Sequence, residues 1–211
     1  MQNAKPILFY LLRLSIYAAF MVGIVEILKY DAHRTDLPER FSEDSLTELV
    51  QVIFLLAGAI LCLWQALVKK AHAAFFISVS AFFAISFFRE FNNFMNTYIF
   101  DSSWQIPVYL IIFSYLFYAY KRIPSILEDM TRFLPTHGFG VLTTGLLIVF
   151  IFSRLYGLHG IWMDLLGENY IRDVKNISEE GIELLGYGIM LLGVIGLLGH
   201  SSKMKSHQLN A

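Results

Sequence analysis

The chain has 211 residues, of which 56% are hydrophobic and 16% charged, and its formal net charge is −1. Soluble domains usually carry about 25% charged residues, so this composition excludes an ordinary soluble domain and indicates an integral membrane protein. The mean hydropathy of +0.58 agrees with that interpretation. A near-neutral chain lacks the basic surface typical of nucleic-acid binding, and a single cysteine, Cys62, excludes an internal disulfide.

Long apolar runs follow one another along the chain, each bounded by charged residues, proline or polar clusters. They approach the roughly 20 residues that a transmembrane helix needs, whereas the strands of a membrane barrel would alternate in polarity. The first run, Ile7–Leu28, lacks the small-residue cleavage site of a secretory signal, so we interpret it as a retained span. We predict an all-α polytopic transmembrane bundle, a single domain over residues 1–211, with six spans at about 7–28, 46–68, 73–94, 104–120, 138–158 and 181–199.

Lysine and arginine set the predicted orientation of this bundle. They occupy all four segments on one side of a six-span series: Lys5, Lys69, Lys70, Lys121, Arg122, Arg132, Lys203 and Lys205. Two of the three loops on the other side also contain basic residues, but acidic residues outnumber them there. We therefore predict that both termini are cytoplasmic and that the chain is a multi-pass protein of the cell inner (plasma) membrane.

Two connecting segments are amphipathic rather than continuously apolar. The stretch 160–178 predicts a short helix lying on the outer surface, and the stretch 123–134 predicts a similar helix on the inner surface. The glycines of the last span favour close helix packing.

Ionisable and amide side chains collect in the outer turns of several spans. A charge within a span costs about 2.5–3.5 kcal/mol at mid-helix, so such side chains usually turn inward and pair. A purely structural role is the alternative: Ser45 to Glu48 fits a helix capping box, and arginines beside acids serve as ion pairs that join helices. The binding candidates are Glu48, Gln51, Arg89, Glu90, Asn93, Arg154, Glu180, Glu183 and Tyr187.

Three of these carboxylates, Glu48, Glu90 and Glu183, come from three different spans at similar depth. Carboxylate and amide oxygens suit hard cations, so a divalent cation is the cofactor that this set suggests, with these three as metal ligands. The Glu-x-x-His pattern of helical di-iron sites is absent. We expect Arg89 to pair within the bundle and at least one of the three acids to be left with a raised pKa, because like charges at close range do not both ionise easily.

Three classes of function fit this pattern. The first is an outward-facing carboxylate-rich site between helices that binds a cation or a polar lipid or solute group. The second is a membrane-embedded enzyme that uses a metal or paired carboxylates on a lipid-linked substrate. The third is a non-catalytic accessory subunit of a membrane complex. The expected partners are membrane lipids and, in the third class, another membrane protein, with no nucleic acid.

Overall fold

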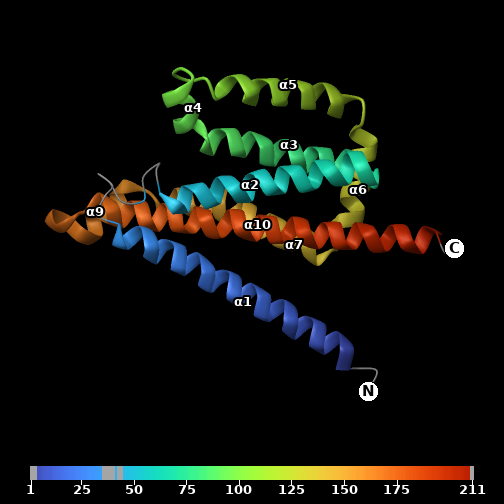
Figure 1. Cartoon of the computed structure of the whole chain (residues 1–211), viewed down its shortest axis with the longest axis horizontal. Coiled ribbons are helices and arrows are strands. Elements are labelled where there is room, and N and C mark those ends of the chain that lie inside the picture. The colour runs from blue at the N-terminus through green and yellow to red at the C-terminus, as the bar shows by residue number, and fades with distance from the viewer. Residues whose placement is uncertain (1–3, 35–40, 42–44, 210–211) are drawn as a thin grey trace.

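The computed structural model describes residues 4–34, 41 and 45–209, and every regular element in these ranges is a helix (Figure 1). The elements are α1 (Ala4–His33), α2 (Leu46–Trp64), η1 (Gln65–Lys69), α3 (Ala73–Glu90), α4 (Asn92–Tyr98), α5 (Gln105–Tyr120), α6 (Ile123–Phe133), α7 (His137–Leu147), η2 (Ile148–Ser153), α8 (Arg154–Tyr156), α9 (His159–Leu166), η3 (Gly167–Asn169) and α10 (Arg172–Leu209). The elements η1 and η2 are π-helical turns, and η3 is a 3₁₀ turn.

Within the described ranges, five helical segments are long and apolar enough to cross a membrane: Pro6–His33, Leu46–Lys69, Ala73–Glu90, His137–Tyr156 and Arg172–Ser202. The structure therefore supports a multi-pass membrane protein. The predicted fourth span corresponds to α5, an apolar helix of 16 residues. At 1.5 Å per residue it is about 24 Å long, which is shorter than the roughly 30 Å hydrocarbon core of a bilayer.

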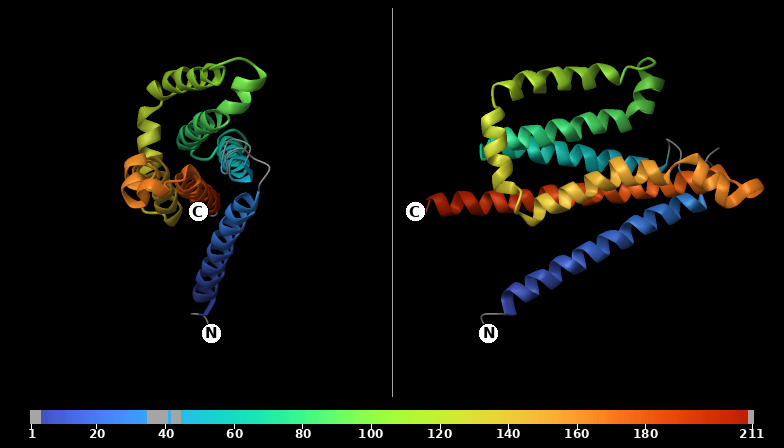
Figure 2. Two further views of the ribbon diagram at one scale, coloured as in Figure 1. Left: turned by 90° about the vertical axis from the view of Figure 1, so that its left-hand side faces the viewer. Right: turned by 180° about the vertical axis from the view of Figure 1, so that it is seen from behind.

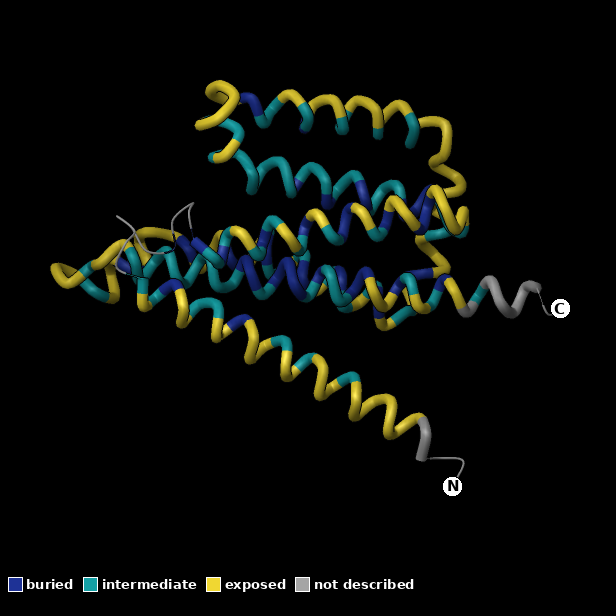
Figure 3. The backbone as a smooth tube through the Cα atoms, viewed as in Figure 1, coloured by how far each residue is buried: buried dark blue, intermediate teal, exposed yellow. Residues whose placement is uncertain are grey.

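The core lies between α2, α3, α10 and the α7–η2 segment, where most of the fully buried side chains are found (Figure 3). Phe76 and Phe83 of α3 and Met190 of α10 are inaccessible to solvent. In contrast, α1 exposes apolar side chains such as Phe9 (70%), as does α5 with Phe113 (68%). Large exposed apolar faces are unusual in soluble proteins, and lipid is the solvent that suits them.

The closest helix packing in the core joins α7 to α10 through glycines. A Cβ atom on Gly145 would meet the carbonyl oxygen of Gly186 and the backbone nitrogen of Met190. A Cβ on Gly138 or Gly193 would likewise meet backbone atoms of the opposite helix. The two backbones are in direct contact at these points, as is common between transmembrane helices.

The bundle has two ends, and both chain termini lie at the same one (Figures 1 and 2). We call this the termini end. Helix α6 also lies there, and a hydrogen bond of 2.6 Å between His72 and Asp129 joins the start of α3 to α6. The opposite end, which we call the α4–α9 end, carries α4, α9 and the beginnings of α2 and α10. Helix α1 contacts the bundle at the α4–α9 end and leans away from it toward the N-terminus.

Helix α1 is anchored to α2 by a buried aspartate. Both carboxylate oxygens of Asp31 accept backbone hydrogen bonds from the first turn of α2, from Leu46 N (3.0 Å) and Thr47 N (2.7 Å). The hydroxyl of Thr47 donates a third bond to the same carboxylate (2.6 Å). Asp31 thus satisfies amide groups that a helix N-terminus leaves without partners, and fixes the point from which α1 diverges.

Two of the predicted segments differ from the structure, and a third matches it. The third predicted span, at about 73–94, ends at Glu90, because the side-chain amide of Asn92 donates to the carbonyl oxygen of Arg89 (2.7 Å) and the chain turns into α4. The predicted surface helix at 160–178 is divided: α9 forms its first half, and its last residues already belong to α10. The predicted inner helix at 123–134 is present as α6.

Candidate functional site

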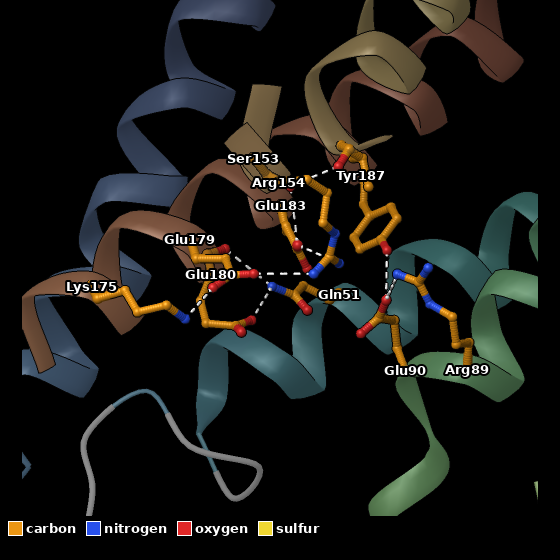
Figure 4. Close-up of polar contacts among 11 residues, drawn as sticks. Gln51, Arg89, Glu90, Ser153, Arg154, Lys175, Glu179, Glu180, Glu183 and Tyr187 are labelled. Carbon is orange, nitrogen blue, oxygen red and sulfur yellow. Dashed lines mark hydrogen bonds and ion pairs between the residues drawn. The ribbon is translucent and has the colours of Figure 1, made fainter. Parts of the chain in front are cut away.

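The predicted candidates lie at the α4–α9 end, where α2, α3, α8 and α10 meet (Figure 4). Glu48 and Gln51 are in the first turns of α2, and Arg89 and Glu90 are in the last turn of α3. Arg154 follows the π turn η2 directly. The first turns of α10 carry Glu179, Glu180, Glu183 and Tyr187.

These side chains, apart from Glu48, form a network that we call the polar cluster. Arg154 and the acids of α10 form one half of it. The Arg154 guanidinium contacts Glu183 (2.6 Å) and Glu179 (3.0 Å). Glu183 is almost fully buried and also accepts a hydrogen bond from the hydroxyl of Ser153 (3.1 Å), whereas the Arg154 side chain is 46% exposed. Lys175, one turn before Glu179, forms a second ion pair with it (2.6 Å).

Glu90 is the centre of the other half. Its Oε1 atom accepts hydrogen bonds from the Arg89 guanidinium (2.8 Å) and from the buried hydroxyl of Tyr187 (2.7 Å). The Arg89 guanidinium also lies 5.7 Å from the centre of the Phe150 ring, where the ring face attracts a cation. These contacts tie the end of α3 to α10 across the bundle.

Gln51 and Glu180 lie between the two halves. The Gln51 amide nitrogen donates to the carboxylate of Glu180 (3.1 Å) and to its backbone oxygen (3.1 Å). The Gln51 amide oxygen is buried and has no hydrogen-bond partner among the described residues. Glu48, Glu90 and Glu179 each lie close enough to repel the charge of Glu180.

A cavity of about 550 Å³ opens in front of Glu48 and Glu90, between α1, α2, α3 and α4. Asn93 also lines it, and Arg34 is the one lysine or arginine among the described lining residues. Four aromatic residues belong to its lining: Tyr30, Phe91, Phe94 and Tyr98. We call it the aromatic–carboxylate cavity. The rings of Phe91 and Phe94 stack with centroids 4.7 Å apart, and those of Phe94 and Tyr98 lie 4.6 Å apart.

The nine candidates form two groups, which Glu90 connects through its bonds to Arg89 and Tyr187. Glu48, Glu90 and Asn93 line the aromatic–carboxylate cavity. The other six belong to the polar cluster behind it: Gln51, Arg89, Arg154, Glu180, Glu183 and Tyr187. Arg89 forms an ion pair with its neighbour Glu90, and Arg154 forms one with Glu183.

The three proposed metal ligands do not share one space in this arrangement. Glu183 is absent from the cavity lining and directs its carboxylate to Arg154 and Ser153. In the part of the chain that the structure describes, no group of three or more His, Cys, Asp or Glu side chains is arranged to hold a metal ion.

Sequence reasoning did not select several residues of this region. The Lys175–Glu179 pair could have been found from its i, i+4 spacing on a helix. The aromatic walls carried no such signal, because Phe91 and Phe94 fall within the predicted third span and resemble side chains that face lipid. Comparisons with protein-family models, with curated proteins and with solved structures found no match to this chain, so its function has to be argued from this geometry.

Proposed function

We propose that this chain is an integral membrane protein that binds an organic ammonium group in the aromatic–carboxylate cavity, carried either by a solute or by a lipid headgroup. The observation behind the proposal is that two carboxylates from different helices, Glu48 and Glu90, and four aromatic rings line the same cavity. Aromatic cages recognise quaternary ammonium ions through the negative faces of the rings, and nearby carboxylates add charge attraction.

The charge and size of the cavity support a small cationic group. Its described lining carries two carboxylates against one arginine, Arg34. Outside the lining, Arg89 pairs with Glu90, and Glu180 adds a further acid close enough to repel both lining carboxylates. A volume of about 550 Å³ falls within the range of about 300–1,000 Å³ that is common for small-molecule sites. An ammonium group is preferred over a divalent metal because four aromatic side chains line the cavity beside Glu48 and Glu90, and aromatic rings attract organic cations but offer no oxygen ligand to a hard metal ion.

The membrane placement is part of the same proposal. We propose six spans, with α5 as the shortest, and an orientation in the plasma membrane in which the α4–α9 end faces outward. The concentration of Lys and Arg at the termini end supports this orientation. The cavity would then take its ligand from the outer aqueous phase or from the outer leaflet.

A thermal-melting series with the full-length protein in neutral detergent tests the binding chemistry. The probes are choline, ethanolamine, MgCl₂ and CaCl₂, compared at constant ionic strength with KCl. We expect choline or ethanolamine to raise the melting temperature in a saturable way. Glu48→Gln should weaken this binding at least about tenfold, as expected for losing a charged partner worth about 1.5–3 kcal/mol.

Two further variants separate the cavity from a general charge effect. Tyr98→Ala removes an exposed aromatic wall and should also weaken ammonium binding. Glu128→Gln is the matched control, because this exposed acid lies on α6 at the other end and should leave binding unchanged. Stabilisation by Mg²⁺ or Ca²⁺ alone, or equal stabilisation by every cation including K⁺, would contradict the proposal.

A further inference from the structure

We propose that a second cavity, at the termini end, is a binding site for an anionic phospholipid. This cavity of about 600 Å³ lies between α1, the end of α6, the start of α7 and the second half of α10. It is separate from the aromatic–carboxylate cavity, which lies at the opposite end of the bundle.

Basic side chains from four different helices line this second cavity. They are Arg13 of α1, Arg132 of α6, His137 of α7 and His200 of α10, and we call it the basic cavity. Its described lining contains no acidic residue. Like charges do not gather on separate helices at random in a membrane protein, and basic pockets between transmembrane helices bind the anionic headgroups of lipids.

The fixed positive charge of this lining comes from its two arginines, Arg13 and Arg132. The guanidinium carbon of Arg13 lies 5.6 Å from the centroid of the Tyr10 ring, and Arg13 makes no ion pair among the described residues. Arg132 pairs with the exposed acid Glu128 (2.5 Å), which lies outside the described lining. The other acid of α6 in this region, Asp129, is directed to His72.

The basic cavity is also lined by neutral groups that can donate hydrogen bonds to a phosphate. The hydroxyl of Tyr17 and Nε2 of His137 lie 3.2 Å apart, so one of the two groups can turn a hydrogen to a ligand. Thr136, the N-cap of α7, and Gly138 also line the cavity. The first amide groups of a helix point outward and favour an anion, which adds to the attraction of the arginines.

An apolar groove continues from the basic cavity and identifies the ligand as a lipid rather than a free anion. The groove, about 410 Å³, shares Tyr17, His137 and Leu192 with the basic cavity. Beyond them it is lined by Gly140, Val141, Thr144 and Ile189. From His137 to Thr144 it follows α7 for about 10 Å, which is most of the depth of one leaflet at about 15 Å.

Because α1 diverges from the bundle, lipid has access to this groove. Only 6% of the apolar window of α1 is buried, and the helix diverges from α10 toward the termini end (Figures 1 and 3). An acyl chain between α1, α7 and α10 would cover apolar surface that the protein itself leaves exposed. The phosphate of the same lipid would then lie among Arg13, Arg132 and His200.

Native mass spectrometry of the full-length protein, titrated in detergent with single lipids, tests this site. The probes are dioleoyl-phosphatidylglycerol and dioleoyl-phosphatidylcholine, which share their acyl chains and differ in net charge. We expect phosphatidylglycerol to bind at least about tenfold more tightly. Arg13→Gln should lower that affinity about fivefold, as expected for one basic group near an anionic lipid.

Three controls locate the effect and distinguish the sources of phosphate. Arg122→Gln removes an arginine that lies at the same end but outside the basic cavity, and it should not change lipid affinity. Leu192→Trp fills the groove without changing charge and should weaken phosphatidylglycerol binding. Glycerol 1-phosphate, which lacks acyl chains, should compete poorly.

Several outcomes would overturn the proposal. Equal affinity for the two lipids would remove the role of the basic groups, and an equal effect of Arg122→Gln would show a diffuse charge effect. Full competition by glycerol 1-phosphate would assign the cavity to a soluble phosphate compound. Retained melting temperatures for Arg13→Gln and Leu192→Trp serve as the folding check, since Arg13 makes no ion pair among the described residues.

Discussion

The ion pair of Arg154 and Glu183 should respond unequally to the loss of its two members. Glu183 is buried, with 3% of its side chain exposed, whereas 46% of the Arg154 side chain is accessible to solvent. In Arg154→Gln the buried carboxylate keeps the hydroxyl of Ser153 but loses its cation. In Glu183→Gln the arginine keeps Glu179 and water.

The magnitudes follow from this asymmetry. Removing one partner of a buried ion pair typically destabilises a protein by about 3–5 kcal/mol, and we take the lower value, about 3 kcal/mol, for Arg154→Gln because water reaches the guanidinium. For Glu183→Gln we expect about 1 kcal/mol or less, since the amide oxygen can still accept a hydrogen bond and repulsion from Glu180 and Glu90 is relieved. The double variant should be more stable than Arg154→Gln alone.

Reversible unfolding by SDS titration in mixed micelles, followed by tryptophan fluorescence, measures these differences. Trp162 is a suitable reporter because it is buried at the same end and its indole N–H donates to the carbonyl oxygen of Tyr156 (3.0 Å). If Glu183→Gln destabilises the fold as much as Arg154→Gln does, or if the two effects simply add in the double variant, the burial argument is refuted.

Two more outcomes are expected from helix packing and topology. Gly145→Ala should destabilise the fold by about 2 kcal/mol, because its Cβ meets the backbone of α10, whereas Gly140→Ala, with open space around it, should be neutral or stabilising by up to about 1 kcal/mol in the same SDS titration. In intact cells of a Cys62→Ala background, Ser102→Cys should react with an impermeant thiol reagent from outside and Lys70→Cys should not; the reverse pattern would invert the proposed orientation.

The helical spans could be predicted from sequence because a run of apolar residues contains most of the required information. The ends of the helices could not, since polar side chains determine them through contacts that hydropathy does not describe. Helix α10 begins at Arg172, before the predicted start at 181, and the Lys175–Glu179 ion pair stabilises its polar first turns. Helix α3 ends early because Asn92 bonds to the carbonyl oxygen of Arg89.

The partners of the candidate residues could not be predicted from sequence. Depth along a span follows from the sequence, whereas the rotation of each helix about its axis depends on packing. Tyr187 is one turn from Glu183 on α10, yet it donates to Glu90 of α3, and Glu183 is directed to Arg154. The close approach of α7 and α10 likewise depends on glycines of both helices. The sequence of one helix does not indicate which glycines of the other helix it will contact.

The two proposed sites differ in how they depend on orientation. The ammonium site rests on carboxylates and rings at the α4–α9 end, and its binding chemistry would be the same on either side of a membrane. The phospholipid site is coupled to topology, because Arg132 belongs both to the positive charge that supports the proposed cytoplasmic placement of the termini end and to the lining of the basic cavity. The cytoplasmic leaflet is the one rich in anionic lipids, so the proposed orientation places the basic cavity where its ligand is concentrated. Thiol labelling at Lys70 and Ser102 therefore tests the orientation on which the phospholipid site depends. Its result does not change the expected binding chemistry of the ammonium site.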